Sequence, residues 1–385
     1  MIHCRPIIAI HWAALWARAS ALGDEAARAG SWRHRACGLE PHRSHTVASL
    51  IVKCVCVALL ASVVHTAAAS PSPVRPTVIV VIGAPGTPEY GADFAHSADA
   101  WSDACKRASI NHIEIGRAPS LAAGSPPPPA KTDRERFQEI LATEAPGTQP
   151  LWIVLIGHGT YDGKEAKFNL RDLDFSDADL AQWLKPFTRP IAVIDCSSAS
   201  APFLNRLAAP GRVIITATRS GSEVNYARFG IYLADAIANP AADLDKDGQT
   251  SLLEAFLAAS RGVEDFYQTA GRLATEHALL DDNGDGLGVA ADWFQGTRAT
   301  RAAKNGVPID GPSAHQWFLI PSPEEQALTP EMRAQRNAVE LKIEALRQKK
   351  SALSETDYYH QLDALLLTLA RLQLQASSPT TVPAG

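Results

Sequence analysis

Two stretches of the chain decide the fold: LWIVLIGHGT at residues 151–160 and IAVIDCSSAS at residues 191–200. Each is an almost unbroken apolar run that stops at one chemically reactive side chain, His158 in the first stretch and Cys196 in the second. Short apolar runs rich in β-branched residues predict strands that are buried on both faces, as in a parallel sheet covered by helices. Because ligands bind at the carboxyl ends of such strands, we expect both side chains at one edge of the sheet.

The rest of the chain alternates predicted strands with predicted helices. Apolar, β-branched runs predict strands at 76–83, 110–116, 150–157, 189–195 and 212–218. Apolar residues at helical spacing predict helices at 92–108, 132–145, 176–187, 226–238 and 251–268. This alternation predicts an α/β fold over residues 76–320, with a mainly parallel sheet between two layers of helices.

Residues 323–376 predict a separate C-terminal α-helical hairpin. Two stretches there carry apolar residues at helical spacing. They join near residues 351–355, where Ser354 and Asp357 have the spacing of a helix start. The hairpin is expected either to pack on the α/β domain or to mediate self-association. The tail at 377–385 is expected to be disordered.

The N-terminal segment, residues 1–69, is expected to lie outside the fold. Residues 49–65 are apolar with a single lysine, and three alanines follow at 67–69, which is the layout of a secretory signal peptide. Export to the periplasm or the cell exterior is therefore expected. If the segment is not cleaved, residues 50–66 are expected to anchor the protein in a membrane instead.

Composition and motifs exclude several classes of function. The formal net charge of −5 argues against a nucleic-acid partner, because nucleic-acid-binding surfaces are normally basic. The GAPG sequence after the first strand lacks the spacing of a dinucleotide fingerprint, and no G-x-S-x-G motif surrounds Ser197, Ser198 or Ser220. We therefore expect no organic cofactor and no serine-hydrolase site. Only Cys105 and Cys196 remain outside the N-terminal segment, too few for a disulfide framework, so we expect the first buried in a helix and the second free.

A thiol and an imidazole at one sheet edge can form an activated nucleophile. The imidazole raises the fraction of thiolate, which is the attacking species. The backbone N–H groups of Gly159 and Cys196 are candidates for stabilising the oxyanion of acyl transfer. Each motif also has a plainer interpretation, because His158 stands between glycines in a turn and Cys196 fits an inert core position. Their occurrence after successive strands favours the catalytic interpretation.

These motifs resemble the caspase-like cysteine peptidases, and among them the legumain branch (peptidase family C13). The order of an apolar strand with His-Gly, then an apolar strand with Asp-Cys, is similar to the order in that family. The segment ITATRSGSEVNYA at 215–227 resembles the family segment that follows. The likeness covers about residues 76–270 and implies a caspase-like α/β/α sandwich.

The resemblance implies an exported cysteine endopeptidase that cleaves peptide or protein substrates through an acyl-enzyme. His158 would be the catalytic histidine, Cys196 the nucleophile and Gly159 an oxyanion donor. The loop over residues 218–226 would help to form the substrate pocket. Its candidate substrate-binding residues are Ser220, Ser222 and Asn225.

Two alternatives share this fold. The family includes members without peptidase activity, so one alternative is a calcium-binding pseudopeptidase that binds partner proteins. The other is a transamidase, which passes the acyl group to an amine. The chain also departs from legumain at Ala95-His96, where the family has an Arg-His pair. The resemblance therefore does not carry over asparagine specificity.

Two acidic loops are candidates for calcium binding. DLDKDGQTSLLE at 243–254 matches the pattern D-x-D-x-D-G-x5-E in full, and DDNGDGLGVAAD at 281–292 matches it less well, because its last position is Asp292. Candidate ligands in the first loop are Asp243, Asp245, Asp247, Gln249, Ser251 and Glu254. Candidate ligands in the second loop are Asp281, Asn283 and Asp285. Each loop also has a plainer interpretation as an acidic turn, and any bound calcium is expected to be structural.

Overall fold

The computed structural model describes residues 75–117 and 131–377. The predictions for residues 1–69, including the signal peptide or anchor, lie outside the described residues, as does nearly all of the tail at 377–385. Within the two described ranges, no helix is both long and apolar enough to span a membrane.

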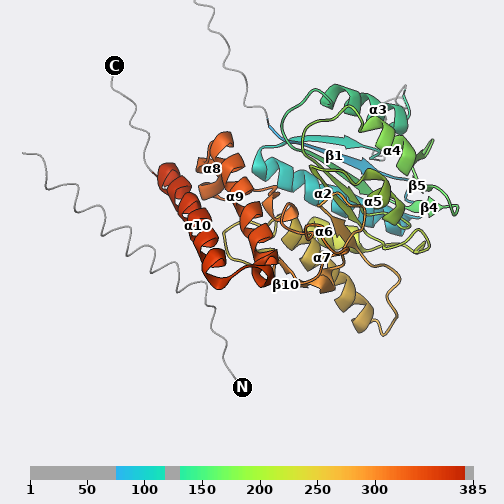
Figure 1. Ribbon diagram of the computed structural model, residues 1–385. Helices are drawn as coiled ribbons and strands as arrows, with labels where there is room; N and C mark the ends of the chain where they lie inside the picture. Colours follow the sequence, from blue (N-terminus) through green and yellow to red (C-terminus); the bar gives the residue numbers. More distant parts are fainter. Residues whose placement is uncertain (1–74, 118–130, 378–385) are drawn as a thin grey trace, which may run out of the picture. The chain divides into compact units, whose positions relative to one another are not determined.

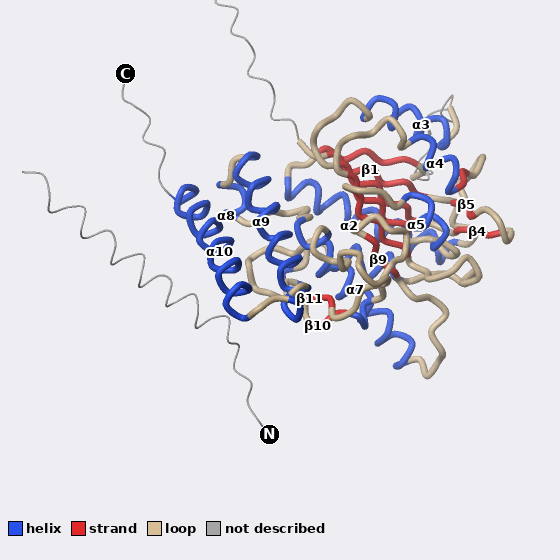
Figure 2. Tube along the Cα trace, in the orientation of Figure 1, coloured by secondary structure: helices blue, strands red, loops and turns tan. Residues whose placement is uncertain are grey.

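The fold is built on a six-stranded sheet, shown in Figures 1 and 2. Its strands, in spatial order, are β2 (Asn111–Ile115), β1 (Thr77–Ile82), β3 (Leu151–Ile156), β7 (Ile191–Asp195), β8 (Arg212–Thr216) and β9 (Leu279–Asp281). All neighbouring pairs are parallel except β8 and β9, which are antiparallel. The prediction of a mainly parallel sheet is therefore confirmed.

Helices cover both faces of the sheet. One face packs against α2 (Pro88–Ala108), α6 (Phe229–Ala236) and α7 (Leu252–Thr269). The other face packs against α3 (Asp133–Glu144), α4 (Asp177–Trp183) and α5 (Ala201–Leu207). Because successive strand residues point to opposite faces, Val154 and Ile194 lie in the first core, and Ile153 and Val193 lie in the second. The predicted α/β/α sandwich is confirmed.

Capping residues fix where several helices begin. Thr87 accepts a hydrogen bond at the start of α2, and Pro88 occupies the first turn, where a missing N–H costs nothing. This helix therefore begins before the predicted position 92. Ser176 and Asp179 form the capping box of α4, as their spacing predicts.

A second, antiparallel sheet was not predicted from the sequence. It contains β4 (Gly159–Tyr161), β5 (Ala166–Phe168) and β6 (Phe175–Ser176). These strands have two or three residues each, which is too short for an alternating apolar pattern to appear. The short pair β10 (Phe294–Gln295) and β11 (Arg298–Ala299) escapes prediction for the same reason.

The C-terminal region forms the predicted helical hairpin. Its helices, coloured orange to red in Figure 1, are the short α8 (Pro323–Ala327), α9 (Pro330–Gln348) and α10 (Glu355–Ser377). Ser354 accepts a hydrogen bond from the Asp357 N–H at 3.0 Å, as the cap spacing predicts. The Gln316 side chain donates to the Asn337 carbonyl of α9 at 3.0 Å, so the hairpin contacts the α/β domain.

Candidate functional site

His158 and Cys196 lie at one edge of the sheet. Leu155 of β3 is paired with Asp195 of β7, so Cys196 is level with Ile156 and His158 lies two residues further along its strand direction. Residues two apart in a strand point to the same face, which puts both side chains on the side covered by α2 and α6. A catalytic Cys-His pair requires both side chains at the same edge and on the same face of the sheet, and His158 and Cys196 meet this requirement.

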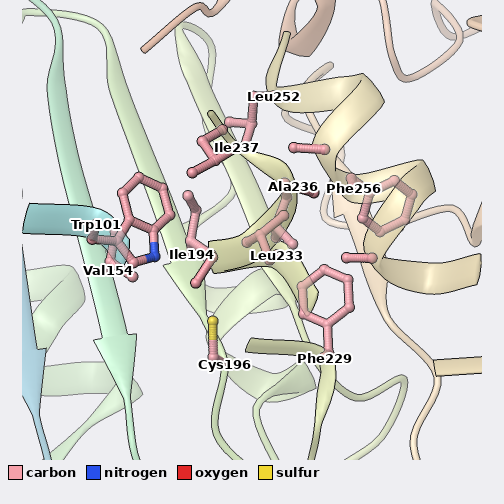
Figure 3. Packing of buried hydrophobic residues seen from close by; sticks show 14 of the residues in the cluster. Trp101, Val154, Ile194, Cys196, Phe229, Leu233, Ala236, Ile237, Leu252 and Phe256 are labelled. Carbon is pink, nitrogen blue, oxygen red and sulfur yellow. The ribbon is translucent and has the colours of Figure 1, made fainter. Parts of the chain in front are cut away.

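The Cys196 side chain points into the hydrophobic core. The residue is only 4% exposed and belongs to the same cluster as Ile194 and Leu233. Figure 3 shows its sulfur directed from the strand end toward these side chains and Phe229. Helix α6 approaches so closely that a Cβ added to Gly230 would lie 2.6 Å from the Cys196 Cβ and 3.1 Å from its Sγ.

This environment disfavours the thiolate. Burial raises the pKa of the Cys196 thiol far above its usual range, and the carboxylates of Asp195 and Glu276 raise it further. Reactive cysteines have the opposite surroundings, which are partly exposed and electropositive. In this conformation the Cys196 thiol is a small apolar core group.

His158 is oriented by a backbone carbonyl. Its Nε2 lies 3.1 Å from the Pro85 oxygen. Because a carbonyl oxygen only accepts, Nε2 carries the hydrogen, and Nδ1 of the neutral ring is left as the basic nitrogen. The rings of Tyr90, Phe94 and Tyr226 surround the imidazole, with centroids 4.9, 5.3 and 5.7 Å away. The histidine is therefore positioned as a base, inside an aromatic enclosure.

The structure does not assemble the predicted catalytic group. Among the described residues, no hydrogen bond joins His158 to Cys196. Both predicted oxyanion donors are engaged elsewhere: the Gly159 N–H donates to Ser198 Oγ at 3.2 Å, and the Cys196 N–H donates to the Leu155 carbonyl at 2.9 Å. The prediction that Gly159 offers a free N–H differs from the structure, because the Ser198 hydroxyl is within hydrogen-bond distance of both the N–H and the carbonyl of Gly159, which begins β4.

The loop between β8 and α6 reaches the same edge. Its Tyr226 contacts the ring of His158. The predicted substrate-binding residues lie in this loop, where Ser222 and Asn225 are exposed and the Ser220 and Ser222 hydroxyls are 3.2 Å apart. In the described part of the chain, no hydrogen bond joins these three side chains to His158 or Cys196, and the contact between this loop and His158 is made by Tyr226.

A half-buried hydrogen bond between Glu223 and His277 holds that loop in place. Glu223 Oε1 lies 2.6 Å from His277 Nδ1, and its Oε2 accepts the N–H groups of Arg219 and His277 at 3.0 and 3.2 Å. The Glu223 carbonyl also accepts the Ala199 N–H at 2.8 Å. The sequence placed Glu223 in a family-like segment but gave no signal for His277, which follows α7.

Asp195 is a buried acid for which the sequence predicted no specific role. It is 0% exposed, and its Oδ1 accepts the Ser197 N–H at 3.0 Å and the Ser197 hydroxyl at 2.6 Å. Its Oδ2 is buried and has no hydrogen-bond partner. Burial raises the pKa of Asp195 to about 7, and the two bonds from Ser197 offset only part of that rise. Asp195 therefore holds the turn after β7 through its two hydrogen bonds from Ser197.

The loop over 243–254 folds with its acidic side chains turned inward. Three carboxylate oxygens, one from each of Asp243, Asp245 and Asp247, lie within 4.8 Å of one another. Asp243 accepts the N–H groups of Lys246 and Gly248, Asp245 accepts that of Asp247, and Asp247 accepts that of Gln249. The last predicted ligand, Glu254, is 0% exposed, and its Oε2 closes the capping box of α7 with Ser251.

The second acidic loop has the same internal hydrogen bonds. Asp281 accepts the N–H groups of Gly284 and Gly286, Asn283 accepts that of Asp285, and Asp285 accepts that of Leu287. The side chain at the last position, Asp292, is exposed in a short 3-10 helix. The first three predicted ligand positions therefore accept equivalent backbone hydrogen bonds in both loops, and only the first loop also holds its last one inward.

A histidine that the sequence did not flag joins the first loop. His315 Nε2 lies 3.1 Å from Asp245 Oδ2, and the ligand atoms of Asp245, Glu254 and His315 lie within 4.8 Å of one another. No local pattern signals this contact, because His315 lies far downstream of the loop in sequence.

The comparisons with known proteins give distant likenesses. No family model matches the chain, and no match is found among curated proteins. Two similar solved structures are caspase-1 from Spodoptera frugiperda (9% identity, TM-score 0.34, covering 54% of this chain and 86% of that one) and the Drosophila initiator caspase Dronc (12% identity, TM-score 0.38, covering 57% and 84%). Both are caspases rather than legumains, and likenesses this distant carry no argument about activity.

The packing of α6 over Cys196 predicts a severe effect of Gly230→Ala. The new Cβ overlaps the Cys196 side chain, so we expect a loss of about 1–3 kcal/mol in the free energy of unfolding. Gly91→Ala in α2 is the matched control, because its Cβ meets only Pro85 at 3.6 Å or beyond and helical alanine is favoured by roughly 0.5–1 kcal/mol. Equal stability of the two variants in urea unfolding would contradict the placement of Cys196.

The raised pKa of Asp195 predicts a pH dependence of stability. The folded protein retains a proton on Asp195 that the unfolded chain releases above about pH 4, so this stabilisation falls as the pH rises through about 7. Asp195→Asn keeps an acceptor for Ser197 without the charge. We therefore expect the variant to lose less stability than wild type between pH 5 and 8, by at most about 3 kcal/mol. Exposed Asp363→Asn is the control, and parallel pH profiles for wild type and Asp195→Asn would refute the assignment.

Proposed function

We propose that this protein is a calcium-stabilised scaffold of caspase-like architecture that binds partner proteins and does not hydrolyse peptides through Cys196. The single observation that carries the proposal is the position of the Cys196 side chain beneath α6, 4% exposed and with a raised thiol pKa. A cysteine nucleophile must be able to reach the substrate carbonyl, and it must be ionised to a thiolate. Burial in an apolar core opposes both requirements.

The engaged backbone donors support the same proposal. Acyl transfer requires N–H groups that point at the developing oxyanion. The N–H groups of Gly159 and Cys196 are instead bonded within the protein. Turnover would therefore require the separation of Ser198 from Gly159 as well as the release of Cys196 from beneath Gly230.

Protein partners are the proposed ligands of the loops that contain Glu223 and His277. The loop that contains Glu223 exposes Val224, which is 60% exposed, and the loop that contains His277 exposes Leu273, which is 91% exposed. The Glu223–His277 pair ties these two loops together. Large apolar side chains on loops that are held in place are typical of protein contacts. The N-terminal layout supports export as part of this proposal.

A cysteine endopeptidase is the second candidate. The specific observation in its favour is the orientation of His158, whose Nε2 is bound to the Pro85 carbonyl and whose Nδ1 remains basic on the face that Cys196 shares. In this reaction the Cys196 sulfur would attack the peptide carbonyl, and His158 would protonate the leaving amine. A transamidase would use the same acyl-enzyme with an amine as acceptor. Both require α6 to move away from Cys196.

Calcium is the proposed cation because the loop ligands are oxygen atoms. Carboxylates, an amide side chain and backbone carbonyls are the ligands that calcium prefers. The equivalent hydrogen bonds in the 243–254 and 281–292 loops support two such sites, with the first more complete because Glu254 is turned inward.

Peptide-library profiling tests the absence of turnover. We expect wild type, Cys196→Ala and His158→Ala to leave the library equally uncleaved, with calcium or with a chelator. Cleavage by wild type that disappears in Cys196→Ala would establish the endopeptidase instead, and the formation of amide-linked products in the presence of an added amine would identify the transamidase.

Thermal unfolding tests the calcium proposal. Calcium at about a hundredfold excess over its dissociation constant is expected to stabilise the protein by roughly 2.7 kcal/mol, which raises the melting temperature reversibly. Asp247→Asn removes one ligand charge but keeps the acceptor for the Gln249 N–H, so it is expected to weaken the response. Asp363→Asn is the control, because Asp363 is exposed and lies outside both loops. A melting temperature that does not change with calcium would contradict this part of the proposal.

A further inference from the structure

The first acidic loop is joined by a nitrogen ligand from another part of the chain. His315 comes from the 3-10 helix Ala314–Gln316, which packs against α7. Its Nε2 lies 3.1 Å from Asp245 Oδ2. The carboxyl oxygens of Asp245 and Glu254 and the His315 nitrogen lie mutually within 4.8 Å. Ligands on opposite sides of a divalent cation lie about 4–5 Å apart, so one ion can contact all three.

The ion pair with Asp245 alone does not satisfy the hydrogen-bonding capacity of the His315 nitrogen. Nε2 is buried and makes no well-aligned hydrogen bond, although the Asp245 oxygen is near. A buried polar nitrogen without a hydrogen bond is costly, and a metal ion at the centre of the three side chains would satisfy it. Glu254 is 0% exposed, and its carboxylate is held in place by the N–H groups of Leu244 and Asp245 on Oε1 and by the N–H and hydroxyl of Ser251 on Oε2.

The ligand chemistry decides which class of cation fits. Calcium takes oxygen ligands almost without exception, whereas imidazole nitrogen suits first-row transition metals. Carboxylates also bind Mn²⁺, so a site with several carboxylates and one imidazole suits this ion on both counts. Asp245 belongs both to the three-carboxylate group and to the group with His315, so the two groups are adjacent.

We propose that His315 is a ligand of the 243–254 site and that this site therefore also takes a divalent first-row transition-metal ion. The inference rests on the cation site proposed above and adds its nitrogen ligand and its metal class. Asp245, Glu254 and His315 form one side of the coordination sphere, and Asp243 and Asp247 supply oxygens from the other.

Mn²⁺ alone is the probe, with the full chain as the protein. Pulsed electron paramagnetic resonance of the Mn²⁺-loaded protein is expected to show modulation from an imidazole nitrogen, which His315→Gln abolishes. Competition titrations are expected to show that His315→Gln weakens Mn²⁺ binding by roughly 10–100-fold and changes calcium binding less than about threefold. His96→Gln is the matched control, because His96 is exposed on α2 and its one ion-pair partner among the described residues is Asp235.

The outcomes separate this inference from the calcium proposal. Nitrogen modulation that is present in wild type and His96→Gln and absent in His315→Gln supports it. Calcium binding without nitrogen modulation from bound Mn²⁺ overturns it and leaves the calcium site standing. Binding of neither ion overturns both. Circular dichroism of His315→Gln, together with retained calcium binding, ensures that a loss of Mn²⁺ binding does not reflect misfolding.

Discussion

The packing of α6 against the carboxyl end of β7 is the contact on which the rest of the candidate site depends. Gly230 lets the helix approach Cys196 without an intervening side chain, so the thiol becomes part of the core between sheet and helix. The same helix start fixes the loop before it, because Glu276 accepts the N–H groups of Arg228 and Phe229 at 2.7 and 2.9 Å. A movement of α6 would therefore alter the thiol, the loop and the enclosure of His158 together.

The architecture was predictable because it follows from local patterns. The apolar runs at 151–160 and 191–200 predict buried parallel strands, and the structure has them as β3 and β7. Capping pairs such as Ser176 and Asp179 mark helix starts directly. The short strands β4 to β6 were not predictable, because they form only when Gly159 and Phe168 meet in an antiparallel pair.

The site was predictable only to the level of the sheet edge. Strand order brings His158 and Cys196 to one edge, but whether a side chain at a strand end lies in the core or at the surface depends on what covers it. For Cys196 the cover is Gly230, and for the Gly159 N–H it is Ser198, neither of which the strand patterns reveal. His315 was missed for the same reason, since it meets Asp245 only after the chain has folded.

The first acidic loop also connects the α/β domain to the C-terminal helices. Gln249 Oε1 accepts the N–H of Ser322, the capping residue of α8, at 2.9 Å. The Leu252 N–H donates to the Trp317 carbonyl at 2.8 Å, and Trp317 packs edge-on against Trp152 of β3 at 5.1 Å. A cation in this loop would thus stabilise the docking of the hairpin as well as the start of α7.

Site-resolved alkylation of the native full-length chain tests the central claim most directly. The protein is treated with iodoacetamide over a range of pH, and the modification of Cys196 is measured by mass spectrometry against the denatured chain. The burial of the thiol and its raised pKa predict that native Cys196 stays unmodified while the denatured chain is fully alkylated. Rapid modification of native Cys196 near neutral pH, slowed in His158→Ala, would contradict the account and establish a reactive Cys-His pair.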